Sequence, residues 1–256
     1  MKIFILCGGF GSRLDHEGTL IAKPMVRIGP KPILTHIIHN FIDQGYNDFV
    51  FCLGYKSNTV INYFLKENKK RIKILKKEGK NIKFSYKLNK NKFTGNLIYT
   101  GLNTGTGGRI KKAYKTLKLN EDIMMTYGDG LANVNVKKLY EFHKSHGKLA
   151  TLTAVRPSAR FGEINFDKDK VIMFKEKPQS GEGWVNGGFF VLEPEVVNFL
   201  KDFDGPFEKD PLESLCNQGQ LMAYKHGGFW QAMDVWRDKM ILNKMWKNNK
   251  AEWKVW

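Results

Sequence analysis

The chain has 256 residues, of which 42% are hydrophobic, so it can bury one sizeable core, and we predict a single domain over residues 1–256. Its 42 lysines and arginines outnumber its 25 aspartates and glutamates, giving a formal net charge of +17. No apolar run reaches the roughly 18–20 residues of a membrane span, and no secretory signal is recognisable, so we expect no membrane partner.

The predicted elements alternate between strands and helices along the chain. Apolar runs predict strands at residues 3–7, 48–53, 81–86, 97–99, 122–127 and 150–155. Helical periodicity predicts helices at residues 32–42, 60–65, 109–117, 136–146, 193–200 and 235–246. This alternation is typical of an α/β, Rossmann-like fold, with a mostly parallel twisted sheet and helices on both faces.

Ligands of such sheets bind at the carboxyl ends of the strands. The loops after Leu6, Leu53 and Tyr127 should therefore face one crevice. The sequence pattern changes over residues 156–190, where short strand-like runs are separated by glycines and Pro178. We predict that they form a small antiparallel extension over the active-site crevice.

A lysine-rich stretch, residues 66–92, carries twelve lysines or arginines against two glutamates. It has few aromatic side chains for stacking on bases, and no nucleic-acid-binding module surrounds it. We therefore interpret it as a solvated surface excursion and expect no nucleic-acid partner. The chain has three scattered cysteines, Cys7, Cys52 and Cys216. They support neither a disulfide framework nor a zinc site, which favours a reducing, cytoplasmic location.

The first strand runs straight into closely spaced glycines, Gly8-Gly9-Phe10-Gly11-Ser12-Arg13-Leu14, with Lys23-Pro24-Met25 soon after. Glycines let backbone N–H groups approach phosphate oxygens without Cβ interference, and Arg13 and Lys23 add two cations. The pattern indicates a loop that holds a nucleoside triphosphate. The alternative, for the glycines alone, is a tight turn with a solvated arginine.

Two aspartates are candidate Mg²⁺ ligands. Asp129 lies between two glycines just past a buried strand, and Asp234 ends the apolar stretch Phe229-Trp230-Gln231-Ala232-Met233. Mg²⁺ prefers one or two carboxylates together with phosphate oxygens and water. The alternatives are a turn aspartate at Asp129 and the N-cap of the following helix at Asp234.

Two further motifs point to a second phosphate and a sugar. Lys177, in Glu176-Lys177-Pro178, is placed to meet the phosphate of an acceptor, and Asn186, in Asn186-Gly187-Gly188, to read a sugar hydroxyl. Each motif alone is more often a turn. His143 and His146 are spaced as a metal pair, but no third ligand is near in sequence, and we favour a solvated helix face.

Taken in order, these motifs resemble those of the sugar-1-phosphate nucleotidyltransferases. The shared elements include the glycine loop, Lys23-Pro24-Met25, Thr106-Gly107-Gly108-Arg109, Gly128-Asp129-Gly130, Glu176-Lys177-Pro178, Asn186-Gly187-Gly188 and residues 229–234. They span essentially the whole chain and are most similar to the branch that uses CTP and glucose 1-phosphate. Departures are Ser12 for Thr, Cys7 for Ala, Tyr99 for Asp, and a poor match over residues 66–92.

The resemblance implies transfer of CMP from CTP to α-D-glucose 1-phosphate with release of pyrophosphate, for surface-polysaccharide synthesis by a homo-oligomer. It implies that Arg13, Lys23, Asp129 and Lys177 are catalytic and that Asp129 and Asp234 bind Mg²⁺. It places the nucleotide on Leu6, Gly8, Gly9, Gly11, Ser12, Arg13, Lys23, Thr104, Arg109, Gly128 and Asp129. It places the sugar phosphate on Tyr127, Gly162, Glu176, Lys177, Asn186 and Gly187. The alternatives are another base or acceptor, or a non-catalytic nucleotide sensor.

Overall fold

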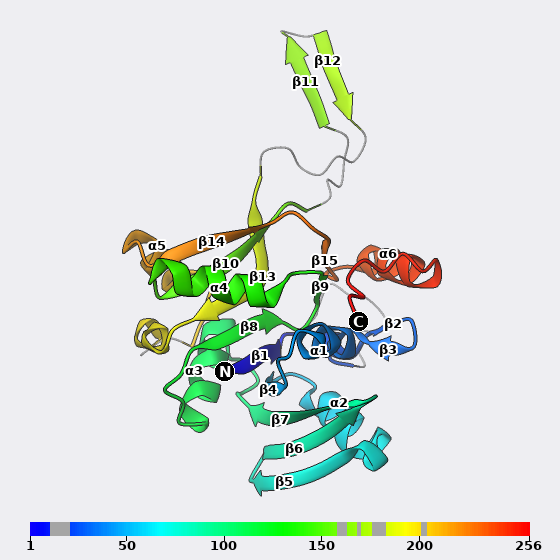
Figure 1. Cartoon of the computed structure of the whole chain (residues 1–256), viewed down its shortest axis with the longest axis vertical. Coiled ribbons are helices and arrows are strands. Elements are labelled where there is room, and N and C mark those ends of the chain that lie inside the picture. The colour runs from blue at the N-terminus through cyan, green and yellow to red at the C-terminus, as the bar shows by residue number, and fades with distance from the viewer. Residues whose placement is uncertain (11–20, 158–162, 168–169, 176–182, 201–203) are drawn as a thin grey trace.

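The computed structural model describes residues 1–10, 21–157, 163–167, 170–175, 183–200 and 204–256 (Figure 1). A nine-stranded sheet forms the centre, in the order β14-β10-β13-β8-β1-β4-β7-β6-β5. Seven of these strands run in one direction, and β6 and β13 run against them. The strands are β1 (Lys2–Cys7), β4 (Asp48–Leu53), β5 (Ile72–Glu78), β6 (Asn81–Leu88), β7 (Asn91–Tyr99), β8 (Ile123–Tyr127), β10 (Ala150–Val155), β13 (Val185–Leu192) and β14 (Leu221–His226).

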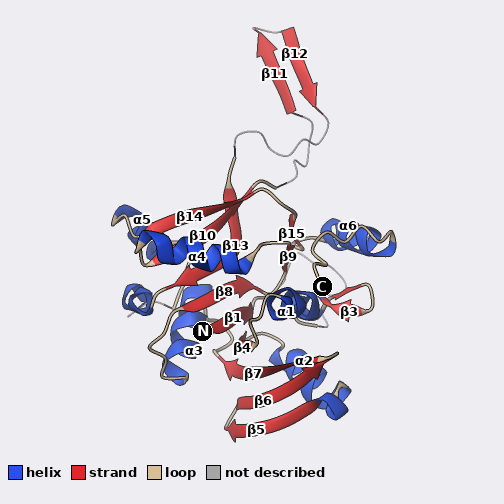
Figure 2. Cartoon of the chain, in the orientation of Figure 1, coloured by secondary structure: helices blue, strands red, loops and turns tan. Residues whose placement is uncertain are grey.

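Helices cover both faces of the sheet (Figure 2). Side chains alternate along β1, so Ile3 and Ile5 face one core cluster and Phe4 and Leu6 face the other. The first cluster also takes side chains of α1 (Ile33–Asp43), α2 (Ser57–Asn62), α4 (Val136–His146) and α6 (Trp236–Lys247). The second takes those of α3 (Thr106–Thr116), α5 (Asp210–Asn217) and the 3₁₀ segment η4 (Pro194–Leu200). The predicted α/β fold is thereby confirmed.

Local signals explain why most helices were predictable. The apolar positions of α1 recur at helical spacing, and all five are buried: Ile33, Leu34, Ile37, Ile38 and Phe41. The helix stops before Gly45, whose φ of 91° is a conformation that glycine adopts most readily. Asn135 caps α4 by accepting a hydrogen bond from the Lys138 N–H at 2.9 Å, and Gly147 follows its last turn with φ 64°.

The lysine-rich segment of residues 66–92 is built into the sheet, so its interpretation as a surface excursion is wrong. After the π-helical turn η2 (Tyr63–Glu67) and the 3₁₀ turn η3 (Lys69–Arg71), the chain forms β5, β6 and the start of β7. Phe84 and Tyr86 of β6 are buried against Phe64 and Phe93, whereas Lys83 and the other β5 and β6 lysines are exposed. Because successive side chains of a strand point to opposite faces, β6 has a buried apolar face although the segment contains many charges.

The segment of residues 156–190 divides into two parts. Strands β11 (Glu163–Asp167) and β12 (Lys170–Lys175) form an antiparallel hairpin, which stands away from the sheet in Figure 1. The covering role of this extension therefore stays a prediction. The last part enters β13 and belongs to the central sheet, between β10 and β8.

His143 was expected on a solvated helix face. His143 of α4 is only 1% exposed, with its ring nitrogens 2.8 Å from Thr151 Oγ1 and 3.1 Å from Glu193 Oε1. The predicted solvated helix face is therefore wrong at His143, because polar partners on neighbouring elements accompany it into the core. Among the described residues, no helix combines the length and the hydropathy that crossing a membrane requires.

Candidate active site

A cavity of about 300 Å³ opens where β1 and β8 end and α3 begins. This is the carboxyl edge of the sheet, where the sequence analysis places the crevice. Nine of the predicted site residues line it: Leu6, Gly8, Gly9, Lys23, Thr104, Arg109, Tyr127, Gly128 and Asp129. Six others lie outside the described residues: Gly11, Ser12, Arg13, Gly162, Glu176 and Lys177.

Lys23 joins the two predicted metal ligands. Its Nζ lies 2.5 Å from Asp129 Oδ2 and 2.7 Å from Asp234 Oδ1. Lys23 opens the 3₁₀ turn η1 (Lys23–Met25), where Pro24 fixes the backbone just behind it. Burial works to lower the pKa of Lys23, but the two carboxylates outweigh it and raise that pKa above its ordinary value.

A small pairing of strands brings Asp234 to Asp129. Strand β15 (Trp230–Ala232) pairs antiparallel with β9 (Gly130–Ala132), and the Met233 N–H donates to the Asp129 carbonyl at 2.8 Å. The N-cap of α6 is Val235, one residue beyond Asp234. The Asp238 carboxylate accepts the N–H groups of Asp234 and Val235 at 2.9 and 3.0 Å. The alternative that Asp234 is a helix cap is therefore wrong.

The donor set of this site fits Mg²⁺. Two carboxylates reach the same ammonium, so they lie close enough to share a cation, and both stay partly open, at 26% and 35% side-chain exposure. Among the residues that the structure describes, no third acidic, His or Cys side chain joins them. A pair of carboxylates completed by substrate phosphates and water is how Mg²⁺ is commonly held.

Arg109 holds three loops together at the cavity wall. It is 3% exposed, and its guanidinium donates to the carbonyls of Gly8, Leu53 and Gly101 and to the Thr100 hydroxyl, at 2.8–3.2 Å. These acceptors follow or end β1, β4 and β7. A Cβ at Gly8 would overlap the guanidinium, which explains a glycine there. Burial lowers the pKa of Arg109. Arg109 thus shapes the nucleotide loops through the backbone.

Tyr127 connects the cavity to the predicted sugar residues. Asn186 Nδ2 donates to the Tyr127 hydroxyl at 3.3 Å, and that hydroxyl donates to Glu208 Oε1. Burial, followed by the charge of Glu208, raises the pKa of Tyr127. Gly188, at φ 78°, lies against the Tyr127 ring, where a Cβ would clash. Sequence reasoning missed Glu208, because an isolated glutamate before a Pro-initiated helix carries no motif.

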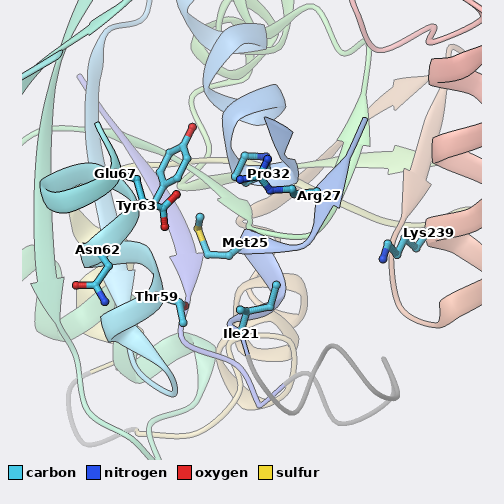
Figure 3. A pocket seen from close by; sticks show the side chains of 9 residues that line it. All are labelled: Ile21, Met25, Arg27, Pro32, Thr59, Asn62, Tyr63, Glu67 and Lys239. Carbon is cyan, nitrogen blue, oxygen red and sulfur yellow. The ribbon is translucent and has the colours of Figure 1, made fainter. Parts of the chain in front are cut away.

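A second, larger cavity of about 390 Å³ lies beside the Lys23-Pro24-Met25 turn (Figure 3). In Figure 3, Asn62, Tyr63 and Glu67 stand on one wall and Lys239 on the other. Its lining residues are Ile21, Met25, Arg27, Pro32, Thr59, Asn62, Tyr63, Glu67 and Lys239. None of the predicted site residues lines it, so size alone does not locate the chemistry.

A mostly parallel sheet with a glycine-ended first strand, and a lysine between two carboxylates at its carboxyl edge, defines an α/β protein built to handle nucleotides. Residues 2–251 match the family model described as nucleotidyl transferase, and the chain belongs to that family of enzymes. The resemblance noted from the motifs is confirmed at this level.

Similar proteins support the same assignment. The chain is 41% identical over 269 residues to a Salmonella typhi protein named glucose-1-phosphate cytidylyltransferase, with 100% of both chains covered. It is 39% identical over 258 residues, again over 100% of both, to a Bacillus subtilis (strain 168) protein named probable glucose-1-phosphate cytidylyltransferase. Its fold matches a UDP-glucose pyrophosphorylase solved with UDP-glucose, at a TM-score of 0.69, 14% identity, and 97% and 98% coverage.

Proposed function

We propose that the chain transfers CMP from CTP to α-D-glucose 1-phosphate, producing CDP-glucose and pyrophosphate. The observation that carries this proposal is that Lys23, in the lining of the cavity, is held between Asp129 and Asp234 at 2.5 and 2.7 Å. Full-length similarity to proteins named for this activity supports CTP and glucose 1-phosphate as the substrates.

The reaction needs positioning and positive charge. A phosphate oxygen of the acceptor attacks the α-phosphorus of CTP in line, one P–O bond forms, and the bond to the β-phosphate breaks. The attacking phosphate is already ionised at neutral pH, so no general base is required. Lys23 opposes the negative charge that grows on the phosphates, while the backbone at Gly8 and Gly9 lines their side of the cavity.

Asp129 and Asp234 would hold Mg²⁺, which when bound supplies positive charge against the phosphates. On the resemblance, we further propose that Arg13 and Lys177, outside the described residues, meet the triphosphate and the acceptor phosphate. We propose that Asn186 and Gly187 bind the sugar. Both are held near the site, because Asn186 donates to the Tyr127 hydroxyl and the Gly187 carbonyl accepts the Trp230 indole N–H at 2.8 Å.

We place this reaction in the cytoplasm, as part of surface-polysaccharide synthesis by a homo-oligomer. The three cysteines are free thiols, which supports a reducing compartment: Cys7 and Cys52 are buried, and Cys216 is exposed.

A substrate panel tests the proposal. The protein is incubated with Mg²⁺, each of four NTPs and a set of sugar 1-phosphates, and pyrophosphate release is measured. We expect CTP with glucose 1-phosphate to give the highest kcat/KM. Faster pyrophosphate release with another pair would show that the substrates are different, while the class of reaction would stand. Release with no pair would favour a nucleotide sensor, the alternative from another class.

A further inference from the structure

Glu208 bonds two hydroxyl groups at the edge of the active-site cavity. Its Oε2 accepts the Thr106 hydroxyl at 2.6 Å, and its Oε1 accepts the Tyr127 hydroxyl. Thr106 is the first residue of α3, Tyr127 is the last of β8, and both line the cavity. Glu208 itself lies in the loop before α5 and is partly buried. One carboxylate therefore ties together two walls of the site.

The carboxylate fixes the direction of each hydrogen bond. An ionised carboxylate only accepts, so the single hydrogen of the Tyr127 hydroxyl points to Glu208. Thr106 Oγ1 accepts the Phe207 N–H at 2.7 Å, so its own hydrogen is also available for Glu208. The Tyr127 oxygen then receives hydrogens rather than giving one, as it does from Asn186 Nδ2 at 3.3 Å.

The same network orients the Asn186 amide. Its Oδ1 accepts the Gly188 N–H at 2.9 Å, which leaves Nδ2 facing Tyr127. Nδ2 has a second hydrogen to offer. Toward a ligand, this end of the site presents an acceptor on Tyr127 and a donor on Asn186, the pair that a sugar hydroxyl matches.

Charge is also divided across the site. Lys23, together with the Mg²⁺ that Asp129 and Asp234 would hold, brings positive charge to the cavity, whereas Glu208 brings a carboxylate behind Tyr127. A phosphate is attracted to the first and repelled by the second, while a neutral hydroxyl is tolerated beside Glu208. This difference in charge favours a sugar phosphate whose phosphate points away from Glu208.

We propose that Glu208 is a positioning residue that makes Tyr127 a hydrogen-bond acceptor for a hydroxyl of the acceptor sugar and directs the phosphate away from that end. The inference deepens the proposed function and rests on it. The role of Glu208 is in recognising the sugar, whichever of its hydroxyl groups bonds Tyr127.

The first test compares Glu208→Gln with the wild type in steady-state kinetics, varying each substrate in turn. Losing one oriented hydrogen bond should raise the KM for glucose 1-phosphate about tenfold and the KM for CTP far less. Glu213→Gln, at an exposed position of α5, is the matched control and should leave both KM values unchanged. Equal changes in both KM values, or none, would overturn the proposal.

The second test uses deoxyfluoro analogues of glucose 1-phosphate, because fluorine cannot donate a hydrogen bond. In the wild type, fluorine at one ring position should cost about tenfold or more in kcat/KM. Tyr127→Phe and Glu208→Gln should both lose that sensitivity at the same position. Tyr127→Phe keeps the ring and so carries the test if Glu208→Gln fails to fold. Wild-type sensitivity in both variants would overturn the roles of Tyr127 and Glu208 in binding the sugar and would leave the proposed function standing. No wild-type turnover with CTP and glucose 1-phosphate would overturn the proposed function first.

Discussion

Lys23 and Asp234 are 211 residues apart in the chain, yet their charged atoms lie 2.7 Å apart. The contact depends on the pairing of β15 with β9, which sets Asp234 beside Asp129 behind a common cation. Residues far apart in the sequence therefore meet at one charge cluster.

Replacing Lys23 tests its share of the transition-state charge. Lys23→Ala should lower kcat about 10²–10³-fold, by analogy with the loss of one stabilising donor, with a smaller change in either KM. It also leaves Asp129 and Asp234 facing each other, so the melting temperature without Mg²⁺ should fall and recover on adding Mg²⁺. Steady-state kinetics and thermal melts measure both effects, and near-normal kcat would argue against the role.

Replacing Asp129 or Asp234 should affect turnover and the response to Mg²⁺, whereas replacing their neighbour Asp238 should affect stability. Asp129→Asn and Asp234→Asn should each abolish most turnover and the Mg²⁺-induced rise in melting temperature, because each proposed ligand loses its charge. Asp238→Ala removes the acceptor of two backbone N–H groups, so it should lower the melting temperature and keep the response to Mg²⁺. A normal Mg²⁺ response in Asp234→Asn would exclude it as a ligand.

Arg109 should be needed for stability as well as for binding CTP. Arg109→Lys cannot reach the loops after β1, β4 and β7 at once, and its buried charge would lose most of the acceptors that the guanidinium has. We expect a loss of about 3 kcal/mol in the free energy of unfolding and a higher KM for CTP. Denaturant unfolding measures the loss, with Lys115→Gln on the exposed side of α3 as the control. If Arg109→Lys were as stable as the control, Arg109 would not be what holds the three loops together.

His36 should make the protein sensitive to acid. Its Nε2 lies 2.9 Å from the Ile28 carbonyl and its Nδ1 accepts the Trp253 indole N–H at 3.4 Å. Burial lowers the pKa of His36 from 6.5 to about 4. Between those values the unfolded chain binds more protons, so the free energy of unfolding should fall by about 3 kcal/mol as pH drops through this window.

The His36→Gln variant isolates that contribution. Unfolding free energies measured from pH 7 to pH 4 should fall less steeply in the variant than in the wild type. His39, whose pKa burial also lowers to about 4, remains in both proteins and supplies a common background. Identical slopes would show that His36 is not held neutral by its surroundings.

The sequence predicted the parts of the site that are encoded locally. Gly8 and Asp129 each follow a short apolar run, and a strand end of a parallel sheet faces the ligand crevice. Asp234 was ambiguous for a physical reason: a carboxylate before a helix can cap it or turn away, and only the long-range pairing of β9 with β15 decides.

Other features depend on contacts that no local pattern carries. Arg109 was predicted beside the nucleotide, but its burial against backbone carbonyls arises from three separate loops. Glu208 gains its importance from Tyr127, which comes from another element. No side chain of β5 or β14 is fully buried, so the apolar residues of these strands do not mark one buried face.

Labelled CTP tests the central claim most directly. The protein is given Mg²⁺, glucose 1-phosphate and CTP carrying ³²P at either the α or the γ position, and the products are separated. We predict that α-label enters CDP-glucose and that γ-label leaves as pyrophosphate, in equal amounts. Appearance of γ-label on the sugar, or of α-label in free CMP without CDP-glucose, would contradict attack of the sugar phosphate on the α-phosphorus.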